Sequence, residues 1–556
     1  MTGAELAWQT LRQLGVSVVF GVPGGAILPL VDAMVTHQDA VNFIVTRHES
    51  AAIHAADGYA RVTGRPSLAL ATSGPGGTNV ITGLATAMTD SVPVVLLVGQ
   101  VPTTLIGTDA FQEADLFGMT MPVVKHSWRI TKANDVGVIL RQAYRLAGEG
   151  RPGPVVVEFP KNIQFEEVDG AVIEESFADD SQPRKWHPEP IAWAKARAYL
   201  KRAKSPVLYV GGGVSSSGTA PLVAQLAERY DCPVTTTLLG LGAFPARHPL
   251  ALGMLGMHGT WYANTAMQEA DLIIACGVRF DDRVTGKLDE FAPKAHIIHI
   301  EVDPAEVNKL VHPDVVLQGN LQEILPKFLE IVPETTHSGW RATIAQWVRE
   351  HALRVPSAPP GTVASAEALQ VIAESLDDED VVVTEVGQHQ MWTALFLPRN
   401  LPRRFLTSGG AGTMGYGFPA SLGAKVATPD HRVVLIAGDG SFQMNLQELA
   451  TLAQYQIGVR IIVFNNAGHG MVRQWQDLFH GQRRHGVRLY NPDFVKLAEA
   501  FGIRGFSVNT VEGLKEALVV SDPVEGPVVI EVAVPEDEHV YPMVPAGLSL
   551  SAVLEG

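Results

Sequence analysis

The stretch from residue 432 to residue 466 constrains the fold of this chain most strongly. Two short apolar runs, 432–437 and 459–464, are rich in β-branched residues and are bounded by turn residues, which is typical of buried parallel strands. Between them, residues 445–453 repeat apolar side chains at helical spacing. The stretch therefore predicts a β-α-β unit, the building block of an open α/β sheet.

Polar residues follow both predicted strands. Asp439 lies in a turn between Gly438 and Gly440, Ser441 comes next, and Asn466 follows the second strand. Open α/β sheets bind ligands at the carboxyl ends of neighbouring strands. A carboxylate and an amide oxygen suit Mg²⁺, which keeps phosphate oxygens and waters as further ligands, and glycines before a helix N-terminus suit a phosphate. The Gly-Asp-Gly turn alone is equally typical of a plain turn, but with Asn466 it indicates a metal and diphosphate site.

Length and composition limit the other possibilities. A chain of 556 residues is too long for one core, and a hydrophobic content of 46% favours large buried sheets over disorder. No apolar run approaches the length of a membrane span, and the first residues do not form a secretory signal. The net charge of −16 disfavours nucleic acid as a partner. Cys232 and Cys276 lie in apolar runs and are interpreted as reduced core residues.

Two stretches have the composition of linkers and divide the chain into three domains. Residues 166–190 are acidic and polar and include Pro183 and Pro188, and residues 355–360 are rich in proline. The predicted domains are therefore residues 1–165, 190–335 and 365–545.

The first predicted domain contains a glutamate in an unusual position. A strand runs into Arg47, His48 and Glu49, and the helix predicted over residues 50–61 has small residues on one face. Glu49 thus stands at a strand end and a helix N-terminus, where a carboxylate serves either catalysis or structure. Glycine-rich loops follow two other predicted strands, at residues 21–26 and 72–79.

These motifs together resemble a known family. Residues 47–49, 56–61 and 72–76 are similar to the pyrimidine-binding domain of thiamine diphosphate enzymes, and residues 438–466 resemble their diphosphate-binding segment. More specific runs, at 107–113, 125–126, 151–155, 160–161, 254–259, 277–283, 470–476 and 541–545, are similar to the large, catalytic subunit of acetohydroxyacid synthase, also called acetolactate synthase. The likeness covers essentially the whole chain. It implies an α/β fold of three domains, each with a parallel sheet flanked by helices.

The resemblance also implies a function. Enzymes of this family decarboxylate pyruvate on thiamine diphosphate and transfer the two-carbon unit to a second pyruvate or to 2-oxobutanoate. The products, 2-acetolactate and 2-aceto-2-hydroxybutanoate, belong to the first common step of valine, leucine and isoleucine biosynthesis. The implied cofactors are thiamine diphosphate, Mg²⁺ and FAD, with FAD taking no part in net redox chemistry.

The family's assembly and location are expected here as well. Active sites at a dimer interface imply a homodimer or a dimer of dimers, and the presence of a small regulatory subunit stays open. No nucleic acid or membrane partner is expected. Because the chain starts directly in the family's first domain, a bacterial-type cytoplasmic enzyme is expected.

Site residues are carried over from the family position by position. Catalytic roles fall on Gly25, Glu49, Gln112, Lys161 and Arg283. Contacts with thiamine diphosphate fall on Glu49, Gln388, His389, Gly412, Met414, Gly438, Gly440, Ser441 and Met471. Contacts with FAD fall on Arg151, Gly211, Gly212, His258, Arg279, Glu301 and Asn320. The substrate pocket is expected to include Phe111, Met257 and Trp475, and the metal ligands to be Asp439, Asn466 and the backbone carbonyl of Gly468.

The resemblance also implies a specific role for some of these residues. Glu49 is expected to bind the pyrimidine ring nitrogen, and Met414 to hold the cofactor in its bent form. Arg283 is expected to bind the carboxylate of the second 2-keto acid, and Trp475 to favour the larger acceptor. Asn320 stands where the family is expected to have an acid.

Three alternatives remain open. A flavin-dependent pyruvate oxidase shares the three domains but uses FAD for electron transfer. Another thiamine diphosphate carboligase or an FAD-free acetolactate synthase is disfavoured by residues 279–283 and Trp475. A non-catalytic protein of this fold would be free to lose Glu49, Asp439 and Asn466, and all three are present.

Overall fold

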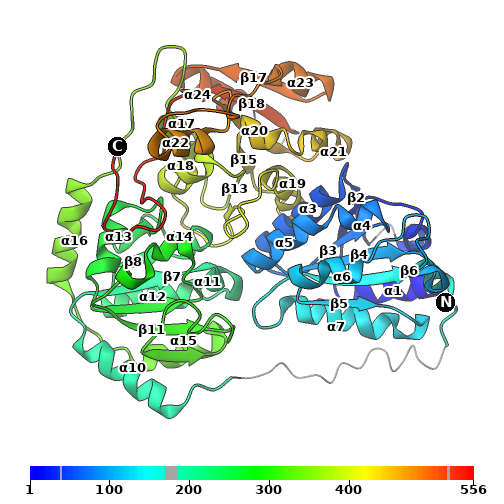
Figure 1. Ribbon diagram of the computed structural model, residues 1–556, viewed down its shortest axis with the longest axis horizontal. Coiled ribbons are helices and arrows are strands. Elements are labelled where there is room, and N and C mark those ends of the chain that lie inside the picture. Colours follow the sequence, from blue (N-terminus) through cyan, green and yellow to red (C-terminus); the bar gives the residue numbers. More distant parts are fainter. Residues whose placement is uncertain (38–39, 170–185, 522–525) are drawn as a thin grey trace.

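The computed structural model of the protein describes residues 1–37, 40–169, 186–521 and 526–556. Three six-stranded sheets follow one another along the chain, and every paired strand in them runs parallel to its neighbours (Figure 1). Helices flank each sheet. The predicted class, α/β with three sheet-containing domains, is confirmed. The middle of the first predicted linker, residues 170–185, lies outside the described residues.

The N-terminal sheet has the strand order β2-β1-β3-β4-β6-β5 and is blue to cyan in Figure 1. Its strands are β1 (Val18–Gly21), β2 (Asn42–Val45), β3 (Ser67–Ala71), β4 (Val94–Gln100), β5 (His126–Arg129) and β6 (Val155–Pro160). Its helices are α1 (Gly3–Gln13), α2 (Leu28–Ala33), α3 (Glu49–Thr63), α4 (Pro75–Thr78), α5 (Ile81–Asp90), α6 (Leu116–Thr120), α7 (Val136–Gly148) and α8 (Lys161–Phe165). A capping box between Thr2 and Glu5 starts α1.

The middle sheet, green in Figure 1, has the order β12-β11-β10-β7-β8-β9. Its strands are β7 (Pro206–Val210), β8 (Val234–Thr236), β9 (Ala251–Met254), β10 (Leu272–Cys276), β11 (His296–Glu301) and β12 (Val315–Gln318). Its helices are α10 (Pro190–Arg202), α11 (Gly212–Ser217), α12 (Ala220–Tyr230), α13 (Trp261–Glu269), α14 (Asp282–Thr285), α15 (Leu321–Ile331) and α16 (Ser338–Glu350). Cys232 and Cys276 are free thiols buried in this domain.

The C-terminal sheet, yellow to red, has the order β14-β13-β15-β16-β18-β17. Its strands are β13 (Val381–Thr384), β14 (Phe405–Leu406), β15 (Val433–Gly438), β16 (Val459–Asn465), β17 (Arg504–Val508) and β18 (Val528–Ala533). Its helices are α17 (Ser365–Glu374), α18 (Gln388–Phe396), α19 (Gly417–Ala427), α20 (Asp439–Phe442), α21 (Leu449–Tyr455), α22 (Gly470–Phe479), α23 (Phe494–Ala500) and α24 (Val511–Val520). Between α20 and α21 lies a 3₁₀ turn, Leu446–Glu448, so the helix predicted over 445–453 is divided.

The N-terminal and C-terminal domains share one apolar core, because α3 packs directly on α19. The small residues on the face of α3 make this contact close. A Cβ atom added to Gly58 would overlap the carbonyl oxygen of Ala420, and one added to Gly423 would overlap that of Ala55. The small-residue face that the sequence shows on residues 50–61 therefore serves helix packing between two domains.

The end of the chain returns to the middle domain. The backbone N–H of Val544 donates to the carbonyl of Met257, and Leu550 is buried in a middle-domain core. Helix α16 also packs there, with Trp340 donating to the carbonyl of Pro206. The domain boundaries predicted from composition stay a prediction. Among the described residues, each helix is too short or too polar to span a bilayer.

Candidate active site

The polar residues that follow β15 and β16 lie together at the carboxyl edge of the C-terminal sheet. The strands pair in register, with Gly438 opposite Phe464. Asp439 opens α20 directly after β15, and Asn466 follows β16. A small pocket at this edge is lined by both residues and by Gln388, His389, Met414, Gly438, Gly440, Ser441, Gly468 and Met471. The structure thus brings the predicted diphosphate and metal residues into one place.

Asp439 is buried and held by three N–H groups. Its Oδ1 accepts from the N–H of Gly440 at 3.0 Å, and its Oδ2 accepts from the N–H of Gly468 at 3.0 Å. The side-chain amide of Asn491 donates to the same Oδ2 at 2.6 Å. Burial raises the pKa of Asp439, and these donors act in the opposite direction. A cation beside Asp439 would favour its ionised form further.

Two buried polar atoms in the pocket wall have no hydrogen-bond partner among the described residues. They are Nε2 of His389 and Oγ of Ser441. Burial lowers the pKa of His389 to about 3, so this imidazole is neutral at ordinary pH. A Cβ atom added to Gly438 would come within 2.7 Å of His389 Nδ1. Unpaired polar groups are costly when buried, so this pocket is suited to a ligand with several polar oxygens.

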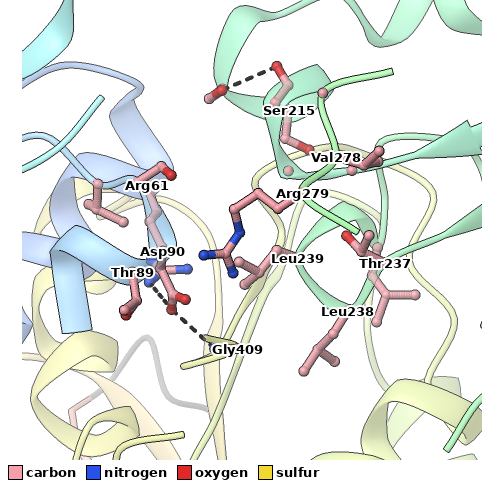
Figure 2. Close-up of a pocket in the computed structure, with 18 of the residues that line it drawn as sticks. Arg61, Thr89, Asp90, Ser215, Thr237, Leu238, Leu239, Val278, Arg279 and Gly409 are labelled. Carbon is pink, nitrogen blue, oxygen red and sulfur yellow. Dashed lines mark hydrogen bonds and ion pairs between the residues drawn. The ribbon is translucent and has the colours of Figure 1, made fainter. Parts of the chain in front are cut away.

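A much larger cavity, of about 720 Å³, lies where the three domains meet. Figure 2 shows Arg279 reaching from the middle domain toward Asp90 of the N-terminal domain, with Gly409 of the C-terminal domain beside them. The glycine loop of Gly211 and Gly212, at the start of α11, forms part of its wall. Met471 lines both this cavity and the small pocket, so the two are adjacent.

All the residues predicted to contact FAD line this cavity, and several belong to polar networks. Arg151 contacts Ser91 Oγ at 2.8 Å and pairs with Asp303 and Glu306. Burial lowers the pKa of His258 to about 4, and its Nδ1 has no hydrogen-bond partner among the described residues. A long ligand with polar groups along its length would fit these surroundings.

Two other residues predicted to contact FAD, Glu301 and Asn320, also make hydrogen bonds within the protein. Burial raises the pKa of Glu301 to about 7, although its carboxylate accepts from the N–H groups of Val302 and Asp303. Asn320 caps α15 by accepting from the N–H of Gln322 at 3.0 Å. An asparagine and an acid cap a helix N-terminus equally well, so the capping role does not depend on the residue type expected here.

The cavity is also lined by Met257, Arg283, Gly412, Met471 and Trp475, of which Met471 also lines the small pocket. The side chain of Arg283 is 60% exposed and contacts Met257 Sδ at 3.6 Å through its guanidinium. Trp475 packs against Phe479 with ring centroids 5.2 Å apart. Arg283 also lies 3.8 Å from Asp282 Oδ2, and its exposed guanidinium with the apolar side chains of this lining suits a small carboxylate-bearing substrate.

Five other predicted residues of the N-terminal domain, Gly25, Glu49, Phe111, Gln112 and Lys161, line neither of the two pockets. Glu49 accepts a 2.9 Å hydrogen bond from the side-chain amide of Asn79 and lies beside Gly76. Gly25, Phe111 and Gln112 are exposed, Phe111 to 88%. Lys161 opens α8 after β6. Of the described residues that line the two pockets, none belongs to this N-terminal set.

The structure adds residues that sequence reasoning missed. Asn491 donates a hydrogen bond to Asp439 and so orients it. In the sequence, the position of Asn491 before Pro492 and Asp493 indicates only a turn that precedes a helix. Glu385 accepts from the N–H groups of Gly415 and Phe418, each at 2.8 Å. Its position at the end of β13, just before the Gln388 loop, is a signal that could have indicated it.

Comparison with known proteins agrees with this geometry. Residues 1–119 match the N-terminal TPP binding domain of thiamine pyrophosphate enzymes, residues 193–328 their central domain, and residues 385–532 their C-terminal TPP binding domain. The chain is 46% identical over 561 residues to the acetolactate synthase large subunit of Parasynechococcus marenigrum, covering 99% of this chain and 90% of that protein. This chain belongs to the acetolactate synthase large subunits.

Other relatives of the acetolactate synthase family give the same result. The isozyme 2 large subunit of Escherichia coli is 44% identical over 557 residues, and the match covers 100% of both chains. The large subunit of Haemophilus influenzae is 44% identical over 558 residues, covering 98% of this chain and 96% of that protein. The family expected from the sequence is confirmed, and the chain carries the domains of a thiamine pyrophosphate enzyme.

Proposed function

We propose that this chain is the catalytic subunit of an acetolactate synthase. It decarboxylates pyruvate and joins the resulting two-carbon unit to a second pyruvate or to 2-oxobutanoate. The observation that carries the proposal is the adjacency of two pockets. A polar pocket at the sheet edge contains Asp439 and Asn466, and through Met471 it adjoins a larger cavity whose lining includes Arg283 and apolar side chains.

The small pocket is proposed to hold the diphosphate of thiamine diphosphate and Mg²⁺. Ser441 Oγ and His389 Nε2 are buried atoms without a partner among the described residues, which supports a ligand there. Asp439, Asn466 and the Gly468 carbonyl supply the oxygen ligands that Mg²⁺ prefers. When bound, thiamine diphosphate supplies an electron sink for the decarboxylation.

The large cavity is proposed to hold FAD. Its volume, the His258 Nδ1 atom and the α11 glycine loop support a long ligand with polar groups. The proposed reaction is redox neutral, so the role of FAD here is structural.

The side chains of this chain are proposed to divide the remaining work. Glu49 holds a proton beside the pyrimidine ring, where a carboxylate within hydrogen-bond reach acts as an acid–base partner. Arg283 binds the carboxylate of the acceptor and sets its orientation. Met257, Met471 and Trp475 exclude water from the reacting end, and Gly25, Phe111, Gln112 and Lys161 complete the wall.

The active form is proposed to be a dimer or a dimer of dimers. Glu49, a buried residue of the N-terminal domain, lines neither pocket of its own chain, and a second copy can bring the Glu49-bearing surface of its N-terminal domain to the pockets. The exposed Phe111 supports contact at that surface. A small regulatory subunit is compatible with the large-subunit family, and the free thiols of Cys232 and Cys276 support a cytoplasmic location.

A product assay tests the proposal. The full-length protein is incubated with pyruvate, with and without thiamine diphosphate and Mg²⁺, and acetolactate is quantified while the flavin absorbance is followed. Acetolactate that forms only with the cofactor, at constant flavin absorbance, is the expected result. Acetate formation with flavin reduction would instead support a pyruvate oxidase, which the flavin-sized cavity keeps as the second candidate.

A further inference from the structure

The segment 407–416 connects β14 to α19 and is irregular throughout. It carries Gly412, which lines the large cavity, and Met414, which lines the small pocket. Gly412 has a φ of +63°, and a Cβ atom there would meet nothing within 4 Å. Because no helix or strand ladder fixes this segment, its position depends on contacts from neighbouring elements.

One of these contacts comes from Asp90, the last residue of α5 in the N-terminal domain. Its Oδ2 accepts from the N–H of Gly409 at 3.1 Å, and its Oδ1 accepts from the N–H of Gly410 at 2.7 Å. The Asp90 side chain is fully buried. A carboxylate that receives two backbone N–H groups forms charge-assisted bonds, which are the stronger kind, so it fixes both peptides together.

Arg61 of α3 orients Asp90 and also contacts the segment directly. Its guanidinium lies 2.9 Å from Asp90 Oδ2 and 2.6 Å from Asp57 Oδ1, and it donates to the carbonyl of Thr407 at 3.1 Å. Asp57 in turn accepts from the hydroxyl of Tyr416 at 2.8 Å. Asp57, Arg61 and Asp90, named here the Asp90 cluster, therefore hold the segment at its beginning, in its middle and at its end.

A fourth contact from the same domain reaches the part of the segment between Gly412 and Met414. Thr86 Oγ1 of α5 lies 2.7 Å from Thr413 Oγ1. The Thr86 hydroxyl also donates to the carbonyl of Thr82 at 2.9 Å, so the Thr413 hydroxyl is left as the donor between the two threonines. This neutral contact is weaker than those of Asp90 but nearer to the two lining residues.

The C-terminal domain offers a carboxylate with the same chemistry in another place. Asp380 accepts from the N–H groups of Asp377 at 2.8 Å and Arg432 at 3.1 Å, and from Nε of Arg432 at 3.0 Å. It lies before β13, at the amino edge of the sheet, and within the described part of the chain its carboxylate has no hydrogen bond to the 407–416 segment. If both carboxylates only stabilise the fold, substitution of Asp90 and of Asp380 should affect cofactor affinity equally. If Asp90 has a role at the site, only its substitution should change that affinity strongly.

We propose that Asp90 is a positioning residue that sets the affinity for thiamine diphosphate by fixing the segment that carries Gly412 and Met414. This inference rests on the proposed function of the two pockets. It gives the N-terminal domain of each chain a part in shaping the cofactor site in the C-terminal domain of the same chain, beside C-terminal contacts such as that of Glu385 with Gly415.

The test compares Asp90→Asn with Asp380→Asn in the full-length protein. Asparagine keeps one acceptor oxygen, but its NH₂ group faces an N–H donor and leaves that donor unpaired. Thiamine diphosphate is titrated in Mg²⁺ by quenching of tryptophan fluorescence, FAD is titrated separately, and melting temperatures are recorded. We expect Asp90→Asn to raise the Kd of thiamine diphosphate about tenfold, and Asp380→Asn to leave it within about twofold while also lowering the melting temperature.

Equal Kd values in wild type and Asp90→Asn overturn the inference, and so does an equal loss in both variants. If Asp90→Asn does not fold, Thr86→Val and Thr86→Ser decide the question. Valine removes the hydroxyl contact and is expected to weaken cofactor binding, whereas serine retains it and is expected to restore wild-type affinity. Identical affinity in both Thr86 variants overturns the inference. A wild-type protein that binds no thiamine diphosphate overturns the proposed function itself.

Discussion

At the residue scale, burial decides the charge of groups beside the proposed cofactor pocket. Burial raises the pKa of Glu385 to about 7, although the N–H groups of Phe418 and Gly415 favour its ionised form. His389, four residues further on, is neutral for the same reason. Surroundings of low polarity favour the neutral forms of Glu385 and His389. The same surroundings would strengthen hydrogen bonds between this pocket and a bound diphosphate.

The raised pKa of Glu385 predicts a pH dependence of stability. The folded protein keeps this proton up to about pH 7, whereas the unfolded chain releases it near 4.5. Folding therefore takes up a proton between these values, and stability falls as the pH rises through them. Glu385→Gln cannot titrate, so from pH 4.5 to 7.5 wild type should lose roughly 3 kcal/mol relative to it. Urea denaturation of the cofactor-free proteins measures this difference, and parallel pH curves would contradict it.

Trp475 is expected to select the acceptor. Pyruvate and 2-oxobutanoate differ by one methylene, which a pocket distinguishes by only about 1–3 kcal/mol. An indole offers broad apolar contact to the extra methyl group at little entropic cost. Wild type should prefer 2-oxobutanoate in competition, and Trp475→Leu should erase most of that preference while still coupling two pyruvates. Equal product ratios from both proteins would show that Trp475 only packs against Phe479.

At the element scale, the contact of α3 with α19 couples the two domains that are proposed to share the chemistry. Glu49 opens α3, and Arg61 of the same helix holds the 407–416 segment. The two helices approach so closely that glycine is required at their crossing. Rigid packing of this kind fixes where each end of α3 lies.

Gly423→Ala tests that packing. The added methyl group would overlap the carbonyl of Ala55, so the helices must separate at a cost of about 1–3 kcal/mol. Gly339→Ala in α16 is the matched control, because a Cβ atom there meets nothing within 4 Å and alanine favours a helix by about 0.5–1 kcal/mol. Denaturation midpoints should fall for the first variant and stay or rise for the second. A tolerated Gly423→Ala would refute the close contact.

At the scale of the whole molecule, the two halves of the proposed site lie apart within one chain. The pockets belong to the middle and C-terminal domains with parts of the N-terminal domain, while Glu49 lines neither of them. A second copy of the chain can supply the missing half, and a symmetric dimer would then contain two complete sites.

Complementation between two inactive variants tests this assembly. Glu49→Gln and Asp439→Ala homodimers should each lose at least about 100-fold in rate, because each site lacks either the acid–base group or a metal ligand. Mixed dimers, isolated with two different affinity tags, should contain one intact site and show about half of wild-type activity. Mixed dimers as inactive as the homodimers would place each site within a single chain.

Local patterns in the sequence determined much of this molecule. Alternation of apolar strands and helices predicts the α/β class, and the β-α-β unit at 432–466 brings Asp439 and Asn466 to one sheet edge. These features are encoded by residues near one another along the chain, because strand ends in parallel sheets have fixed relative positions. The residue motifs also identify the family, which the comparisons confirm.

Only the tertiary structure decided which distant residues touch. Asp90 and Gly409 are more than three hundred positions apart, and no periodicity links them. No periodicity links Asn491 to Asp439 either, although only 52 positions separate them, and none shows that Glu49 lines neither pocket. The physical reason is that hydrogen bonds between irregular segments depend on how whole domains pack. A helix end or a turn has the same local sequence whether or not a partner from another domain reaches it.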